Sequence, residues 1–231
     1  MNNYCLVCTP RSGSYYVLFH LAKERNLTSG KEWYGRMKKV HYDENLRTSP
    51  VTIDYTVNED LLTNHEIEKR RMWLSGRDNF IIKCMPHQLS NTIENRNMST
   101  EDRIRIAVDI LSDYKLIWQI NENKISQFCF RFIAQETSRK GYKGTNREYS
   151  DYDVDKRKTP PPKSFTATKK EFNRFMEIEE FFNGVRLHFP DCEEIIYEDF
   201  IKNKDIIPNP DYTKIMTNYD EICEWFTTYS T

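Results

Sequence analysis

The feature that most constrains the fold is a short strand, a turn of small and basic residues, and a helix, in that order, near the beginning of the chain. Residues 4–8 form a continuous apolar run, which is typical of a strand buried on both faces of a parallel sheet. The turn at residues 9–13 follows, and residues 14–25 carry apolar side chains at helical spacing. This order forms the first half of a βαβ unit and predicts an α/β fold.

The rest of the chain continues the alternation of strands and helices. The other predicted strands span residues 79–84, 115–120 and 193–197. The other predicted helices span residues 59–75, 99–111, 123–138, 167–183 and 218–228. We expect one domain over residues 1–231, a three-layer α/β/α arrangement with a central, mostly parallel sheet. Ligands of such folds lie at the carboxyl ends of the strands.

Two segments lack a regular pattern. Residues 28–58 are irregular and rich in aromatic side chains, so no element is predicted there. Residues 139–166 have no apolar periodicity and include three consecutive prolines. A structureless segment of that length inside a compact domain indicates either a functional flap or disorder.

Charge and hydropathy exclude several classes of partner. The chain has 34 basic and 35 acidic side chains, so it lacks the net basic field of a general nucleic-acid or anionic-membrane binder. No apolar run approaches the 18 or so residues that a membrane span requires. The N-terminal residues lack the charged-then-apolar plan of a secretory signal, which leads us to expect a cytoplasmic protein.

The pair Cys5 and Cys8 has the spacing of a redox motif or of half a zinc site. Both residues fall within the first predicted strand, and no second pair of Cys or His has ligand spacing. We therefore favour buried core thiols for this pair and expect no metal.

The turn after the first strand has the composition of an anion site. Backbone N–H groups at a helix N-terminus hold a phosphate with the help of the helix dipole. Gly13 allows close approach of the backbone, Ser12 and Ser14 add hydroxyl donors, and Arg11 adds a planar cation suited to phosphate or sulfate. The alternative is an ordinary βα turn that contains glycine. The Walker sequence is absent, which disfavours phosphoryl transfer from ATP or GTP.

The sequence Thr-Pro-Arg-Ser-Gly-Ser at residues 9–14 resembles the 5′-phosphosulfate loop of the sulfotransferases that use 3′-phosphoadenosine 5′-phosphosulfate (PAPS), above all the bacterial trehalose sulfotransferase group. The resemblance implies a P-loop-like sulfotransferase fold, PAPS as cofactor and adenosine 3′,5′-bisphosphate as product, with no metal. Its implied cofactor-binding residues in the loop are Thr9, Pro10, Arg11, Ser12, Gly13, Ser14 and Tyr15.

Two further segments carry the resemblance and imply catalytic residues beside Arg11. Glu32 stands 21 residues after Arg11, before an aromatic pair, where the family has the base that deprotonates the acceptor hydroxyl. The residues from Lys83 to His87 are similar to the family's Lys-x-Met-x-x-His, with Lys83 near the transferring group and His87 lining the acceptor pocket or acting as the base. The alternatives are a solvated carboxylate for Glu32 and a structural role for His87.

The segment after the third predicted strand is similar to the family only in outline. The family holds the 3′-phosphate there with an Arg and a Ser, whereas this chain has Asn121 or Glu122 and then Cys129 or Phe130 in those places. Asn121, Asn123, Lys124 and Ser126 are the candidate residues to compensate with contacts to the nucleotide. Arg139 and Lys140 begin a segment that resembles the signature which closes over the nucleotide in cytosolic sulfotransferases, and they are a second candidate; the alternative is a solvated basic loop. Residues 194–200 resemble a late family element that supports the sheet edge.

The sequence thus predicts a sulfotransferase that moves a sulfuryl group from PAPS to a hydroxyl of a carbohydrate or small metabolite. Two alternatives stay open. One is a nucleotide-dependent transferase that resembles a small-molecule kinase, and the other is a catalytically degenerate nucleotide-binding module.

Overall fold

The computed structural model describes residues 3–10, 12–34, 39–42, 51–54, 63–95, 97–139, 164–202 and 211–229. It divides into two compact units. The first comprises Met1–Ile120 with Ile178–Ile195, and the second comprises Asn121–Glu177 with Ile196–Thr231. The single domain expected over residues 1–231 stays a prediction, and each unit is described by itself.

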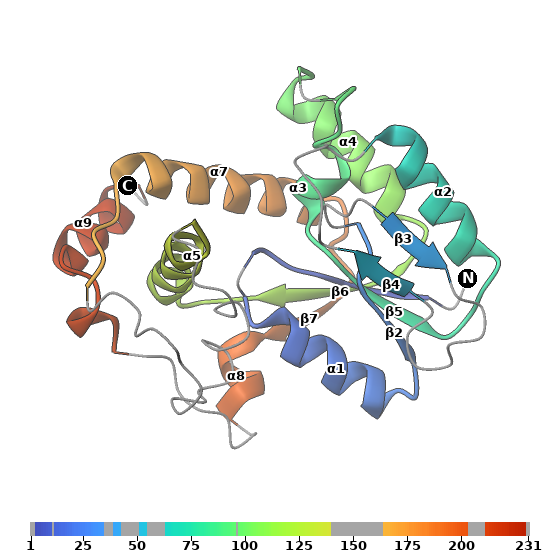
Figure 1. Ribbon diagram of the computed structural model, residues 1–231, viewed down its shortest axis with the longest axis horizontal. Coiled ribbons are helices and arrows are strands. Elements are labelled where there is room, and N and C mark those ends of the chain that lie inside the picture. Colours follow the sequence, from blue (N-terminus) through green and yellow to red (C-terminus); the bar gives the residue numbers. More distant parts are fainter. Residues whose placement is uncertain are drawn as a thin grey trace. The chain divides into compact units, whose positions relative to one another are not determined.

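The first unit is built on a five-stranded sheet with the order β2-β5-β1-β6-β7 (Figure 1). These strands are β1 (Tyr4–Val7), β2 (Thr28–Glu32), β5 (Phe80–Cys84), β6 (Lys115–Ile120) and β7 (Glu193–Ile196). Central strand β1 pairs in parallel with both β5 and β6, and β2 pairs in parallel with β5. The predicted α/β class and the strands near residues 4–8, 79–84, 115–120 and 193–197 are confirmed.

Helices cover both faces of this sheet, as a three-layer α/β/α arrangement requires. Figure 1 shows α1 (Ser14–Glu24) on one face and α2 (Asn64–Ser75) with α4 (Thr100–Leu111) on the other. The second face forms one apolar core, to which the end of α7 (Lys169–Arg186) adds Phe181, Phe182 and Val185. Because side chains alternate along a strand, Cys5 and Val7 enter that core while Leu6 and its register partner Lys83 point to the α1 side.

No helix or strand is predicted for residues 28–58, and this prediction is wrong for at least part of that segment. It contains edge strand β2 and a two-stranded antiparallel sheet of β3 (Lys39–Tyr42) and β4 (Val51–Asp54). The sequence of β2, Thr-Ser-Gly-Lys-Glu, has no apolar side chain. An edge strand needs burial on fewer sides than a central one, so hydropathy alone does not reveal it.

A bulge in β2 determines which of its residues lies beside Lys83 of β5. The register slips by one residue between Ser29 and Glu32, and Lys31 adopts a left-handed conformation with φ 56°. The slip aligns Glu32, rather than Lys31, with Lys83 of β5. The bulge therefore places a carboxylate beside the ammonium group, where a regular strand would place two lysines side by side.

We expect Gly30→Ala to lower the free energy of unfolding by about 1–3 kcal/mol, because a larger residue overpacks a filled site. An added Cβ would lie 2.7 Å from Cγ2 of Ile82, which is fully buried. Gly76→Ala is the matched control, since a Cβ there meets nothing within 4 Å. Urea unfolding of both variants measures the difference, and equal losses would contradict this packing.

The second unit has an aromatic core between helices. Its helices include α5 (Lys124–Arg139), the beginning of α7, α8 (Tyr197–Lys202) and α9 (Tyr219–Tyr229). Phe128 of α5 meets Phe172 and Phe175 of α7 edge-on at 5.9 and 5.5 Å, and Phe226 of α9 meets Phe172 at 4.9 Å. Within the described residues, no helix is long and apolar enough to cross a membrane.

Candidate functional site

The loop between β1 and α1 has the geometry of an anion site. Gly13 precedes the first helical residue in a left-handed conformation with φ 72° and ψ 13°, which glycine adopts without strain. Thr9, Ser12 and Ser14 are buried, and Ser12 Oγ makes no hydrogen bond within the described residues. Arg11, the predicted cation of this loop, lies outside the described residues.

The N-terminus of α1 differs from those of α2 and α4. It has no side-chain cap and no acidic residue in its first turn. In contrast, α2 is capped by Thr63 and α4 by Ser99, and both helices carry acidic residues in their first turns. The positive end of the α1 dipole is thus left without a carboxylate of its own helix, which favours an external anion there.

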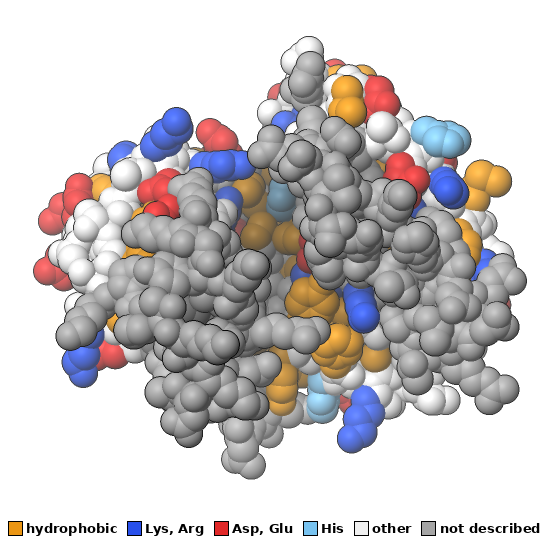
Figure 2. All heavy atoms as spheres, viewed as in Figure 1, with side chains coloured by type: hydrophobic (Ala, Val, Ile, Leu, Met, Phe, Trp, Pro, Cys, Tyr) orange, Lys and Arg blue, Asp and Glu red, His pale blue; other side chains and the backbone are white. Residues whose placement is uncertain are grey.

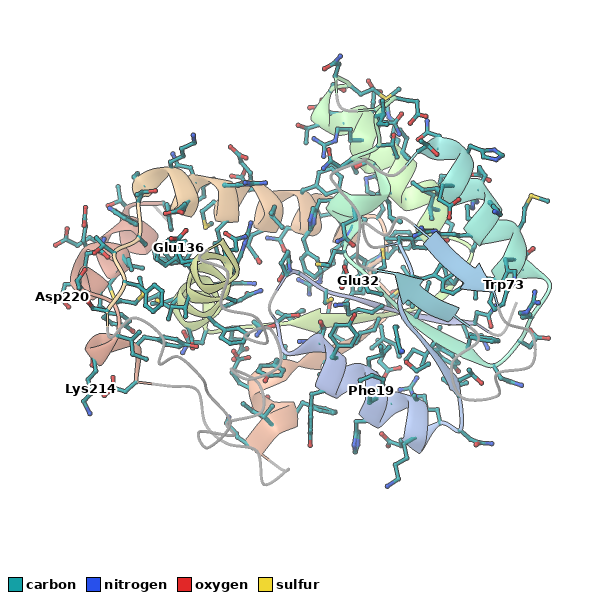
Figure 3. The ribbon with its side chains drawn as sticks, in the orientation of Figure 1. Phe19, Glu32, Trp73, Glu136, Lys214 and Asp220 are labelled. Carbon is teal, nitrogen blue, oxygen red and sulfur yellow. The ribbon has the colours of Figure 1, made fainter. Side chains whose placement is uncertain are left out.

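The structure brings Glu32 and Lys83 together at the carboxyl ends of β2 and β5. Lys83 Nζ lies 2.6 Å from Glu32 Oε2, and their side chains are 5 % and 18 % exposed. The sequence placed both residues in the site, and their direct ion pair is new. Glu32 projects near the end of β2 in Figure 3.

Tyr15, in the first turn of α1, links this ion pair to the β1–α1 loop. Lys83 Nζ lies 3.9 Å from the centroid of the Tyr15 ring, a cation–π contact. Tyr15 stacks on Phe19 with ring centroids 6.0 Å apart, and both rings are exposed, as is Tyr16. Figure 2 shows hydrophobic side chains gathered over α1 at this place. The loop, the ion pair and an aromatic surface are therefore adjacent.

Gln88 is a residue of this site that the sequence analysis missed. Its Nε2 donates to Glu32 Oε1 at 3.1 Å from the short helix α3 (Pro86–Leu89). Its neighbour His87, predicted as an acceptor-pocket residue or base, is partly exposed on the same helix. Adjacency to His87 was the only sequence signal for Gln88.

The thiols of Cys5 and Cys8 are fully buried in the sheet. Burial raises the pKa of the Cys8 thiol, while the nearby Lys83 ammonium acts in the opposite direction. A buried, protonated thiol is a poor nucleophile and a poor metal ligand. Within the described part of the chain, no three ligating side chains gather as a metal site would require.

The residues predicted to hold the 3′-phosphate belong to the second unit, at the N-terminus of α5. Asn123 Oδ1 caps this helix by accepting from the Ser126 backbone N–H at 2.9 Å. The Glu198 carboxylate accepts from the backbone N–H groups of Glu122 and Asn123, both at 3.0 Å. These two amides already bind an anion of the chain itself, so a phosphate at this helix end would have to displace Glu198.

The structure describes only some of the other residues that are predicted to contact the nucleotide. Asn121 and Ser126 are buried, and Lys124 is partly buried. Arg139 ends α5, but its side chain lies outside the described residues, as does all of Lys140.

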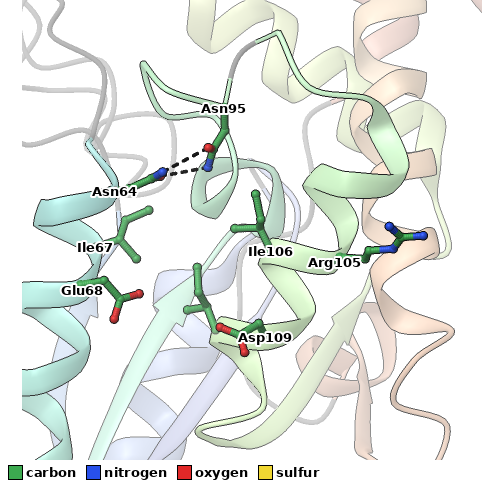
Figure 4. A pocket seen from close by; sticks show the side chains of 8 residues that line it. Asn64, Ile67, Glu68, Asn95, Arg105, Ile106 and Asp109 are labelled. Carbon is green, nitrogen blue, oxygen red and sulfur yellow. Dashed lines mark hydrogen bonds between the residues drawn. The ribbon is translucent and has the colours of Figure 1, made fainter.

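A separate hollow of about 340 Å³ lies between α2 and α4 (Figure 4). Its lining residues are Asn64, Ile67, Glu68, Asn95, Arg105, Ile106, Asp109 and Ile110. The carboxamides of Asn64 and Asn95 bond to each other at 3.1 and 2.9 Å, and Thr92 Oγ1 donates to Asn64 at 2.8 Å. The carboxamides that line this hollow are therefore hydrogen-bonded to each other, whereas the strand-end site presents an ion pair.

No protein-family model matches the chain, and no curated protein matches it either. The strand-end site combines a helix N-terminus, a buried ammonium group and a carboxylate, which together can bind an anionic group and accept a proton beside it.

Proposed function

We propose that the protein is a PAPS-dependent sulfotransferase with a P-loop-like sulfotransferase fold. The observation that carries the proposal is the Glu32–Lys83 pair at the ends of two neighbouring parallel strands, beside the β1–α1 loop. A base and a cation next to an anion cradle are what transfer of a charged group to a hydroxyl needs. The acceptor is a carbohydrate or a small metabolite.

In this reaction the acceptor oxygen attacks the sulfur atom as the bond from sulfur to the 5′-phosphate oxygen breaks. Negative charge develops on the bridging and leaving oxygens, and the ammonium of Lys83, the loop amides and Arg11 stabilise it. Glu32 takes the proton of the acceptor hydroxyl as the new S–O bond forms. The products are a sulfate ester and adenosine 3′,5′-bisphosphate.

A catalytically inactive nucleotide-binding module is the second candidate. It is favoured by Glu198, which occupies the α5 amides that the resemblance assigns to the neighbourhood of the 3′-phosphate. A protein of this kind would bind the nucleotide and transfer nothing.

Transfer of ³⁵S from labelled PAPS to a panel of sugars that includes trehalose tests the proposed reaction. We expect a labelled sulfate ester and a rise in melting temperature with adenosine 3′,5′-bisphosphate. A ligand at about 100 times its Kd stabilises a protein by about 2.7 kcal/mol. Stabilisation without transfer to any sugar or small alcohol would favour the inactive module. Stabilisation by ATP with Mg²⁺ and not by the bisphosphate would indicate a kinase-like enzyme.

A further inference from the structure

The carboxylate of Glu32 is held at both of its oxygens, by two residues of different kinds. Oε2 meets the cationic Lys83 at 2.6 Å, and Oε1 accepts from the neutral amide of Gln88 at 3.1 Å. If the proposed function is right, these two contacts have different fates during the reaction.

An anionic donor competes with Glu32 for Lys83. Lys83 has three N–H donors, so an anionic donor can draw some of them away from Glu32, and the ring of Tyr15 lies 3.9 Å from Nζ. As Lys83 directs donors toward the sulfuryl group, its interaction with Oε2 weakens. The contact from Gln88 at Oε1 persists and keeps orienting the Glu32 carboxylate.

Gln88 is built to make this contact. Helix α3 begins with Pro86, one residue beyond β5, and the backbone N–H of Gln88 donates to Met85 O at 2.8 Å. The following residue, Leu89, is fully buried and anchors the turn. Gln88 Oε1 is buried and makes no hydrogen bond within the described residues. The bond from Nε2 to Glu32 is therefore the contact that orients this amide.

We propose that Gln88 is a positioning residue: its Nε2 donates to Glu32 Oε1 and holds the carboxylate in orientation while Lys83 turns N–H donors from Glu32 Oε2 toward the sulfuryl group. A neutral donor suits this task because it orients the carboxylate without neutralising the charge that makes Glu32 a base. Gln88 does not touch the reacting atoms, and its effect passes through Glu32.

The test compares Gln88→Met, which keeps the length of the side chain and removes the donor, with Gln88→His, which restores an N–H donor. We expect kcat for ³⁵S transfer to fall about 10- to 100-fold in Gln88→Met, as a misplaced catalytic group does. The KM for PAPS and the Kd for adenosine 3′,5′-bisphosphate should stay within twofold of wild type. Gln88→His should recover part of kcat. Gln135→Met, on half-buried Gln135 of α5, is the matched control and should leave kcat unchanged.

The possible failures are distinguishable. An unchanged kcat in Gln88→Met overturns the positioning role. A rise in the KM for PAPS together with a lower melting temperature of the free protein also overturns it, because such changes indicate general structural damage. In both cases, transfer by the wild-type protein leaves the proposed function standing. Absence of transfer by the wild-type protein overturns both. The contact itself is read independently of activity from the side-chain amide resonances of Gln88, which should move in Glu32→Ala. Unmoved resonances would show that Gln88 does not hold Glu32.

Discussion

Glu32→Gln should reduce sulfuryl transfer by about 10²–10⁴-fold, the usual contribution of one positioned base. Glutamine keeps the size of the side chain and can still bond to Lys83, but it cannot take the proton of the acceptor. The affinity for adenosine 3′,5′-bisphosphate should stay unchanged, because the product carries no group that Glu32 must deprotonate. Steady-state ³⁵S transfer and calorimetry measure the two quantities.

The control for this substitution is Glu224→Gln, at an exposed carboxylate of α9. It makes the same chemical change outside the site and should leave transfer at the wild-type rate. Retention of most of the turnover in Glu32→Gln would show that another group, with His87 the first to examine, is the base.

Lys83→Met should weaken PAPS binding about 10- to 100-fold, since a hydrogen bond to a charged group contributes about 1.5–3 kcal/mol. It should also destabilise the fold by about 3 kcal/mol, because it removes the ion pair between Lys83 and the largely buried Glu32 carboxylate. Calorimetry with PAPS and urea unfolding of the free protein check the two effects separately.

The double variant Lys83→Met with Glu32→Gln separates the ion pair from general damage to the core. Removing the charge of Glu32 as well should recover part of the lost stability, so the double variant should be more stable than Lys83→Met alone. A double variant that is less stable by the sum of both single losses would show that the two groups do not interact.

The central part of the site was predictable because it depends on local patterns. An apolar strand followed by Gly13 and a helix has the backbone geometry of an anion site, and Lys83 lies one residue before the end of a strand that hydropathy identifies. Parallel strands end at one edge of a sheet, where ligands of such folds lie, so residues after β1 and near the end of β5 fall in one region.

The contacts that complete the site were not predictable, since they depend on tertiary structure. The polar strand β2 escaped recognition, and only its bulge at Lys31 aligns Glu32 with Lys83. Gln88 sits on a four-residue helix too short to show a periodicity. The bond from the α5 amides to Glu198 joins residues about 75 positions apart in the chain, a separation at which no sequence pattern operates.

The most direct test of the central claim is the affinity of the 9–14 loop for the nucleotide product. Calorimetry should show binding of adenosine 3′,5′-bisphosphate to the wild-type protein and at least 100-fold weaker binding to Arg11→Ala, which loses a bidentate cation for phosphate oxygens. ATP with Mg²⁺ should give no comparable heat. Equal affinity of the wild-type protein and Arg11→Ala for the bisphosphate, or no binding by either, would contradict a phosphosulfate site at this loop.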